Sequence, residues 1–243
     1  MKRHLKRLVA PKFWLVPKKA KKWVVRPRPG PHKKLECIPL LILLRNVLNI
    51  VDTGKDARKI IKLGEIFVDG LPRKDHKYPV GLMDVIEIPK MNQFYRVIVS
   101  SKGLELLKIQ KKDANKKICR INKKTLVKEG QVQLGLHDGK NIIIKVKDPK
   151  KPKEDVYKTG DSLLIEVPSQ KILDHMKMEK ANTVIITGGQ NRGNIAKIKE
   201  VIIRRSREPN KVVCETKEKE FEGIKDYIFV IGKTKPIIDI KGN

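Results

Sequence analysis

The chain has few of the residues that build disulfide frameworks or metal centres. Its three cysteines, Cys37, Cys119 and Cys214, are odd in number and far apart, which argues against a disulfide framework and for a reducing compartment. No cysteine pair has zinc-site spacing, and the five histidines are scattered along the chain. We therefore expect neither a metal nor another cofactor.

Long apolar runs are also missing. The longest covers residues 38–44 and ends at Arg45, whereas a membrane-spanning helix needs about 20 mostly apolar residues. The opening residues, MKRHLKRLVAPKFW, contain no apolar stretch after their charges, which argues against a secretory signal. The sequence therefore predicts neither a membrane-spanning helix nor a secretory signal.

Acidic residues are scarce relative to basic ones. The 243 residues include 56 Lys and Arg against 27 Asp and Glu, which gives a formal net charge of +29. Self-repulsion at this charge opposes compaction, and a polyanion relieves it. Nucleic acid is the first candidate partner and an anionic membrane surface the second. The length suits one large domain or two to three small ones.

The first 37 residues form the most basic part of the chain. Residues 1–36 contain thirteen Lys or Arg and one acid, and five prolines interrupt any helix. Within them, the stretch RPRPGPHKK at 26–34 has no side chain suited to a core. We interpret this segment as an extended arm that becomes ordered on RNA, with cations on phosphates and aromatic rings on bases. A disordered basic tail is the alternative. The candidate RNA-binding residues are Lys2, Arg3, Lys6, Arg7, Trp14, Trp23, Arg26, Arg28, His32 and Lys33.

Two helices are expected next. Residues 38–50 are apolar nearly all round, which predicts a buried helix. Thr53 followed by Asp56 resembles a capping box, and Gly64 suits a helix C-cap. On the helix between them, one stripe collects the cations Lys55, Arg58, Lys59 and Lys62. An ordinary amphipathic helix is the alternative, but the four cations favour phosphate binding.

A hairpin and a final strand complete this region. Asp69-Gly70 is a hairpin signal, and residues 84–88 alternate as a strand does. The segment ARKIIKLGEIFVDGLPRKD, with the later VGLMDVIEI, resembles the small S-four-type RNA-binding domain. The resemblance implies RNA binding by the basic helix face, and more loosely by Arg73 and Lys74.

From residue 93 the periodicity changes to two. Segments 94–99, 131–134, 141–146 and 162–167 read as strands, which favours a small antiparallel barrel. We interpret the His137-Asp138 pair as turn chemistry rather than acid–base catalysis. The basic runs 111–124 and 145–153 are expected to add phosphate contacts, although a solubilising surface is the alternative for each.

The last third contains a strand, the glycine-rich loop TGGQNRG and a second strand. The loop lacks the Gly-Lys-Ser/Thr of a nucleotide-binding loop, and a strand follows where a helix should. This stretch resembles a KOW hairpin. The resemblance places Arg192 and Gly193 at contact positions for RNA or protein and implies an SH3-like barrel.

The order of these segments, with motifs such as WVVRPRPGPH, TGGQNRG and FEGIKDYIFVIGK, resembles the archaeal and eukaryotic e-type family of small-subunit ribosomal protein four, most closely its archaeal form. We therefore expect an α+β multidomain fold. Its parts are a basic extended N-terminal arm (1–37), a small αβ S-four-type RNA-binding domain (38–92), a central β-barrel-like domain (93–175) and a C-terminal SH3-like KOW barrel (176–243).

The resemblance implies a structural constituent of the cytoplasmic small ribosomal subunit, bound to small-subunit rRNA and neighbouring ribosomal proteins. It implies no membrane partner. It implies no catalytic residue and no small-molecule substrate. The first alternative, a pseudouridine synthase, needs a catalytic Asp in a Gly-Arg-Leu-Asp context, which is missing. The second, a KOW-type transcription elongation factor, has no role for the arm or the S-four-type segment.

Overall fold

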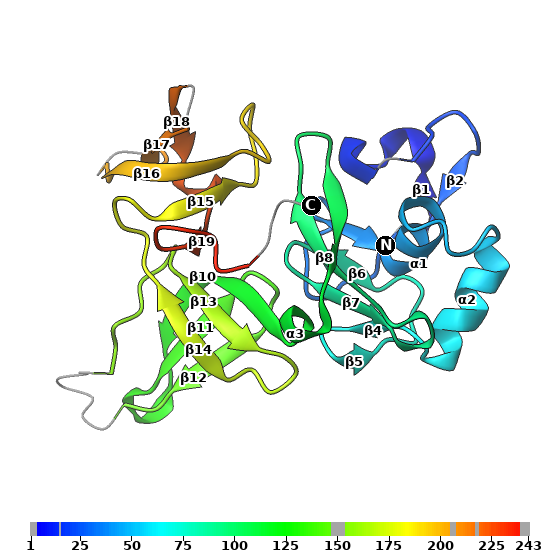
Figure 1. Cartoon of the computed structure of the whole chain (residues 1–243), viewed down its shortest axis with the longest axis horizontal. Coiled ribbons are helices and arrows are strands. Elements are labelled where there is room, and N and C mark those ends of the chain that lie inside the picture. Colours follow the sequence, from blue (N-terminus) through cyan, green and yellow to red (C-terminus); the bar gives the residue numbers. More distant parts are fainter. Residues whose placement is uncertain (1–3, 15, 147–153, 205–207, 217–218, 239–243) are drawn as a thin grey trace. The chain divides into compact units, whose positions relative to one another are not determined.

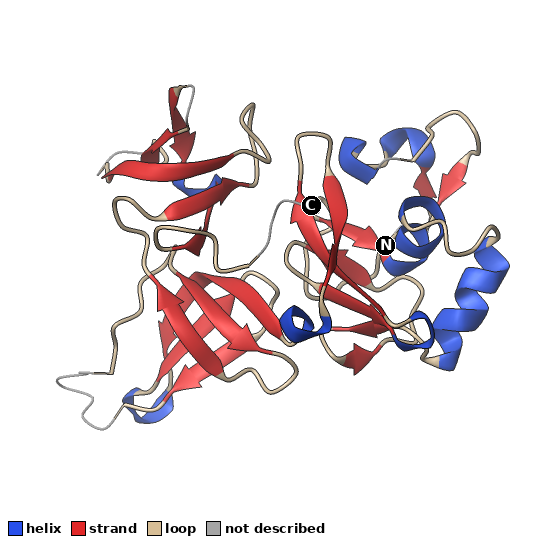
Figure 2. Ribbon diagram, in the orientation of Figure 1, coloured by secondary structure: helices blue, strands red, loops and turns tan. Residues whose placement is uncertain are grey.

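The computed structural model describes residues 4–14, 16–146, 154–204, 208–216 and 219–238. In these residues strands dominate, and helices are few and short (Figure 2). The chain forms two compact units, of which the first runs to Lys117 and the second begins at Ile118. None of the described helices is long and apolar enough to cross a bilayer.

The first unit is built on an antiparallel sheet with the strand order β5-β4-β7-β8-β9 (Figure 1). These strands are β4 (Phe67–Val68), β5 (Leu71–Pro72), β7 (Val85–Ile88), β8 (Gln93–Val99) and β9 (Leu104–Ile109). Two short ribbons accompany it, β1 (Leu5–Lys6) with β2 (Trp23–Val24), and β3 (Cys37–Pro39) with β6 (Pro79–Gly81). The predicted boundary between residues 92 and 93 lies inside this sheet, because β8 pairs with β7. The four-part division of the chain stays a prediction.

The predicted apolar helix is present with a later start. Helix α1 (Leu40–Ile42) continues into a π-helical turn, η3 (Leu43–Val47). Its start at residue 40 follows from Pro39, whose backbone is extended and which ends strand β3. Residues 40–44 are no more than 1% exposed, so the predicted burial is confirmed.

Helix α2 (Gly54–Leu63) forms as its end signals predict. The Thr53 hydroxyl oxygen accepts a hydrogen bond from the Asp56 N–H at 3.2 Å, which is the predicted cap. Gly64 closes the helix with a left-handed backbone (φ 79°), and its N–H donates to the carbonyls of Ile60 and Ile61.

Six short helical turns remain in the described residues. Four of them are η1 (Arg7–Val9), η2 (Lys12–Trp14), η4 (Pro89–Met91) and α3 (Lys111–Ala114) in the first unit. The second unit has two more, η5 (Lys128–Gly130) and η6 (Lys225–Tyr227).

Part of the segment that we expected to be an extended arm, residues 1–37, contributes to a core in this structure. Leu5, Ala10 and Trp14 belong to the hydrophobic core of the first unit. The indole N–H of Trp14 donates to the carbonyl of Cys37 at 2.7 Å, and its side chain is fully buried. The apolar residues scattered among the lysines give the segment a buried side, so it packs as a layer of the fold.

The second unit contains two five-stranded antiparallel sheets (Figure 1). The first has the order β12-β11-β10-β13-β14, from β10 (Lys116–Leu126), β11 (Val132–Leu136), β12 (Asn141–Ile144), β13 (Ser162–Glu166) and β14 (Ile172–Met176). The second has the order β18-β17-β16-β15-β19, from β15 (Thr183–Ile186), β16 (Ile195–Ile202), β17 (Lys211–Glu215), β18 (Glu220–Ile224) and β19 (Ile228–Gly232). The strands expected at 131–134, 141–146 and 162–167 correspond to β11, β12 and β13. The strand expected at 94–99 corresponds to β8, which lies in the sheet of the first unit.

Candidate nucleic-acid interface

Helix α2 presents its four cations on one face. Lys55, Arg58, Lys59 and Lys62 are all exposed, whereas Ala57 and Ile61 on the other side are fully buried. At 1.5 Å per residue this row is about 10 Å long. An elongated row of cations matches a phosphate backbone better than it matches a single phosphate. We call these four residues the α2 cation row.

The structure adds cations at both ends of the α2 cation row. The Lys74 side chain lies beside Gly64, because a β-carbon placed on that glycine would meet it at 3.4 Å. The Arg45 guanidinium lies beside Gly54 in the same way, at 3.2 Å. Burial, followed by repulsion from Arg7 and Arg58, lowers the pKa of Arg45. Arg45 was not a candidate from the sequence. It directly follows an apolar run, and only the folding of the chain brings it to the start of α2.

Arg73 is placed differently from its neighbour Lys74. Its guanidinium lies 4.6 Å from the centroid of the Tyr78 ring and is partly buried. This cation–π contact occupies one face of the guanidinium. Burial, followed by repulsion from Asp84, raises the pKa of Tyr78 to about 12, so the ring stays neutral.

The candidates of the N-terminal segment divide into buried and exposed residues. Arg7 is 5% exposed and donates to the carbonyl of Pro17 at 2.9 Å, Trp14 is in the core, and His32 is 7% exposed. In this structure these three side chains are packed inside the first unit and anchor the segment, and their assignment as RNA-binding residues stays a prediction. Lys6, Trp23, Arg28 and Lys33 are exposed, Arg26 is half-buried, and Lys2 and Arg3 lie outside the described residues.

His32 joins a buried network of charges in the first unit. Its Nε2 lies 2.9 Å and 3.0 Å from the two carboxylate oxygens of Asp84. Lys117 Nζ donates to Asp84 at 2.6 Å and to Asp69 at 2.7 Å. Burial alone would raise the pKa of Asp84, but the charges and hydrogen bonds of His32 and Lys117 outweigh it and hold that pKa well below its usual range. We call these four residues the buried charge network.

Glycine positions show how closely residues 28–32 pack on strand β6. A β-carbon on Gly81 would clash with the imidazole of His32, and one on Gly30 would come within 2.7 Å of Pro79. The Arg28 N–H donates to the carbonyl of Lys77 at 3.0 Å, and its guanidinium pairs with Asp75 at 3.1 Å. RPRPGPHKK is therefore docked along the fold as far as His32.

The basic run 111–124 also divides into outward and inward residues. Lys117 is fully buried in the network, which corrects its expected phosphate contact, while Lys111, Lys112 and Lys116 are exposed. Lys117, Ile118 and Cys119 of strand β10 are all fully buried, so alternation along the strand does not distinguish Lys117 from its exposed neighbour Lys116. In the run 145–153, residues 147–153 lie outside the described residues.

The glycine-rich loop joins β15 and β16. Gly193 has a left-handed backbone (φ 83°), and its N–H donates to the carbonyl of Ile186 at 2.8 Å. Arg192 is partly buried, and burial lowers its pKa. A β-carbon on Gly188 would approach the Tyr227 ring to 2.8 Å. Gly193 thus fixes the loop's shape, and the loop as an RNA or protein contact stays a prediction.

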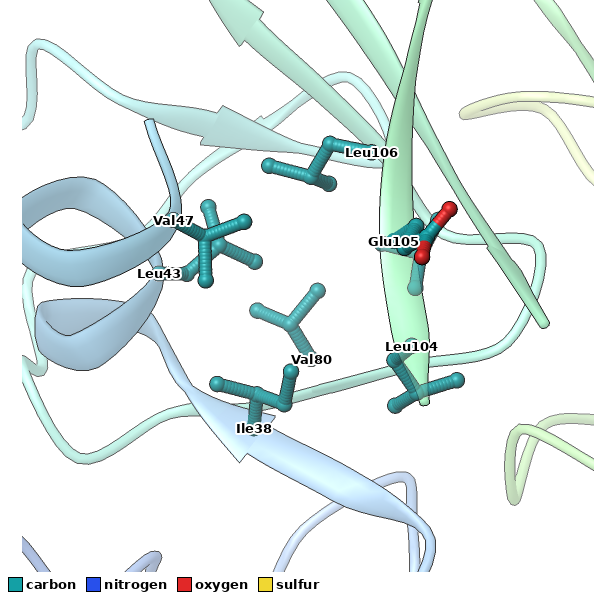
Figure 3. A pocket seen from close by; sticks show the side chains of 8 residues that line it. Ile38, Leu43, Val47, Val80, Leu104, Glu105 and Leu106 are labelled. Atoms are coloured by element: carbon teal, nitrogen blue, oxygen red, sulfur yellow. The ribbon is translucent and has the colours of Figure 1, made fainter. Parts of the chain in front are cut away.

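The cysteines and the pocket of the first unit are parts of the packed interior and give no sign of a catalytic site. The three cysteines are buried free thiols, and burial first of all raises the pKa of Cys37 to about 12 and of Cys214 to about 11. A thiol in that state is a poor nucleophile. Figure 3 shows the side chains around an apolar pocket of the first unit, including Ile38, Val80 and Leu104. They leave essentially no space that a water molecule could occupy.

One group in the described residues has the donor types of a metal site, namely Cys119, His137 and Asp138. The His137 Nδ1 accepts the Arg120 N–H at 3.2 Å, which places the ring proton on Nε2. Asp138 accepts the Lys140 N–H at 3.2 Å and lies 3.5 Å from its ammonium group. These contacts are those of a hairpin turn, as expected for this pair, and we assign no metal to them.

Comparison with known proteins places this fold in a family. Family models described as "Ribosomal family S4e" and "RS4NT (NUC023) domain" match residues 91–172 and 1–35. The chain is 49% identical over 240 residues to the small ribosomal subunit protein eS4 of Methanocaldococcus jannaschii, covering 98% of both chains. The chain belongs to the ribosomal S4e family.

Other S4e proteins agree with this placement. The eS4 protein of Archaeoglobus fulgidus is 48% identical, with 98% of this chain and 97% of that protein covered. The crystal structure of the 30S ribosomal protein S4e from Thermoplasma acidophilum has a TM-score of 0.68 and 30% identity, and the match covers 82% of this chain and 96% of that one. The family resemblance predicted from the sequence, including its archaeal form, is confirmed.

Proposed function

We propose that the chain is a structural constituent of the small ribosomal subunit that binds and staples rRNA through phosphate contacts, with the α2 cation row as a principal contact. Membership of the S4e family supports the ribosomal role. The observation that carries the RNA contact is that all four cations of the row are exposed while the opposite side of α2 is buried. The pseudouridine synthase and the elongation factor have no support from the family.

The contact works by position and charge. Ammonium and guanidinium groups on a rigid helix hold backbone phosphates in place without reading sequence. Lys74, beside the end of α2, lengthens the row, and exposed Lys6, Arg28 and Lys33 add cations from the N-terminal segment. Binding releases counterions from the RNA, so affinity falls steeply with salt.

The finer architecture is part of this proposal. Residues 38–92 serve as an S-four-type RNA-binding domain, since a capped basic helix precedes a hairpin with left-handed Asp69 and Gly70. The sheet of β10 to β14 serves as the central barrel-like domain, and the sheet of β15 to β19 as the SH3-like KOW barrel. Separate modules on one chain can hold neighbouring rRNA segments together, beside neighbouring small-subunit proteins.

The test is gradient sedimentation of a tagged chain at increasing salt. The full chain should cosediment with small subunits and ribosomes until stringent salt removes it. The variant with Ala at Lys55, Arg58, Lys59 and Lys62 should dissociate at lower salt. Loss of four phosphate contacts should reduce the slope of log K against log salt by about three.

The matched control removes the same charge elsewhere, with Ala at the exposed Lys171, Lys177, Lys180 and Lys197. Its behaviour should stay close to that of the unmodified chain. If both variants dissociate from the subunit at the same lower salt concentration, total charge and not the α2 cation row determines binding. Migration at the top of the gradient, or with RNA polymerase, would overturn the ribosomal assignment.

A further inference from the structure

The two tryptophans of the chain are in opposite environments. Trp14 is fully buried, whereas Trp23 is 50% exposed. Trp23 lies on the short ribbon in which β2 pairs with β1. A half-exposed indole on a two-stranded ribbon contributes little to a core. Trp23 is therefore a candidate for contact with a ligand at the surface.

The surroundings of Trp23 are cationic. Lys22 Nζ lies 5.3 Å from the centroid of its ring, and the His4 ring lies 5.5 Å away at an interplanar angle of 50°. Lys6 is its direct partner across the ribbon, and facing residues of paired strands lie on the same side. The first 35 residues contain no Asp or Glu. A large flat ring is thus combined with the positive charges of two lysines and with a second aromatic ring.

We propose that Trp23, with His4, Lys6 and Lys22, forms a stacking site for an unpaired base of single-stranded RNA. The inference rests on the proposed RNA-binding function and gives it a second contact, different in kind from the α2 cation row. An aromatic face stacks on any base, and adjacent cations meet the phosphates on either side of it. Bases inside a duplex are already stacked, so this site selects unpaired nucleotides.

Lys22 does not block the ring. An exposed cation–π contact is weaker than base–aromatic stacking, and the lysine stem is flexible. When a base stacks on Trp23, the Lys22 ammonium moves from the ring to the neighbouring phosphate. His4 and Lys6 stay beside the ring, and the Lys6 ammonium keeps the site positive.

The experiment uses the intrinsic fluorescence of the full chain. Because Trp14 is fully buried, Trp23 is the fluorophore open to contact. A single-stranded 12-nucleotide oligo(U) RNA should quench the emission, and a 12-base-pair duplex RNA should quench it much less. In Trp23→Phe the remaining emission should not respond to either RNA.

Affinity is then measured separately by anisotropy of labelled RNA. Trp23→Ala should weaken binding of the single strand by about tenfold and leave duplex binding unchanged. Trp23→Phe keeps an aromatic face and should stay within about threefold of the unmodified chain. Circular dichroism checks that both variants are folded, which the exposure of Trp23 leads us to expect.

The outcomes separate this site from the proposed function. No quenching by the single strand, or equal affinity of Trp23→Ala, overturns the stacking site. Stronger quenching by anionic phosphatidylserine vesicles than by RNA also overturns it in favour of a membrane surface. If alanine at the α2 cation row leaves duplex binding unchanged, the failure lies with the proposed phosphate contact instead.

Discussion

Helix α2 and the stretch 26–34 have similar charge but are held in place differently. Each contains four Lys or Arg, within ten residues in α2 and within nine in the stretch. In α2 the apolar residues Ala57 and Ile61 are buried and leave every cation of the row at the surface. The other stretch is held by its buried Pro27 and by polar contacts: His32 is buried against Asp84, and the exposed Arg28 pairs with Asp75. Apolar packing therefore leaves the whole α2 cation row for a ligand, whereas in the stretch 26–34 Arg28 also helps to hold the segment in place.

The largest effect is expected from removing Lys117, which shares Asp84 with His32 of the stretch 26–34. Lys117 is the cation shared by two buried carboxylates. Lys117→Met leaves Asp69 and Asp84 without their common partner, and we expect it to destabilise the first unit by about 3–5 kcal/mol. Urea unfolding measures the change. Lys116→Met, at the exposed neighbouring position, is the control and should be nearly neutral. A small effect at Lys117 would mean that the network contributes little to folding.

Gly81→Ala tests the docking of the N-terminal segment itself. The new methyl group would occupy the place of the His32 ring, and the expected cost is about 2–3 kcal/mol. Limited proteolysis should show faster cleavage in residues 26–34. The double variant Gly81→Ala with His32→Ala should lose less unfolding free energy than the sum of the two single losses, because both substitutions act on one contact. Simple additivity would contradict this packing.

The third prediction is a pH dependence. The pKa of Asp84 in the folded chain is held below its usual range. The ionised carboxylate therefore contributes its full stabilisation above the pKa of an unfolded Asp, which is about 4. This stabilisation is lost as the pH falls from there through the lower pKa of the folded state. The gap in unfolding free energy between the unmodified chain and Asp84→Asn should therefore narrow below about pH 4. Denaturant titrations at pH 7, 5 and 3.5 measure it. Exposed Asp52→Asn should show no such narrowing.

The smallest expected effect is at the start of α2. Thr53→Ala removes the acceptor for the Asp56 N–H, which should cost about 1 kcal/mol in thermal or urea unfolding. Thr53→Ser keeps the oxygen and should behave almost as the unmodified chain. A weaker cap frays the helix that carries the α2 cation row, so RNA affinity should fall slightly for Thr53→Ala alone.

Local signals in the sequence predicted local structure well. Thr53, Gly64 and Asp69-Gly70 act within a few residues of themselves, and each does what its type and position indicate. The cation row followed from helical periodicity alone. Such features depend on neighbours in the chain, so a single sequence contains the information.

Contacts between distant residues were out of reach. His32 and Asp84 are 52 positions apart, and Lys117 and Asp69 are 48 apart. In a stretch without helix or strand periodicity, nothing marks His32 as inward and Arg28 as outward. The same lack hid the burial of Arg7 and Trp14, and the pairing that joins β8 and β9 to the first sheet.

The buried charge network also sets an order of events during synthesis. Lys117 is made 85 residues after His32, which at typical elongation rates takes roughly 4–17 s. Until then Asp69 and Asp84 lack the ammonium group that they share, so the network is incomplete. We expect the first unit to reach its full stability only after this step, because Lys117 is the last of the four residues to be made.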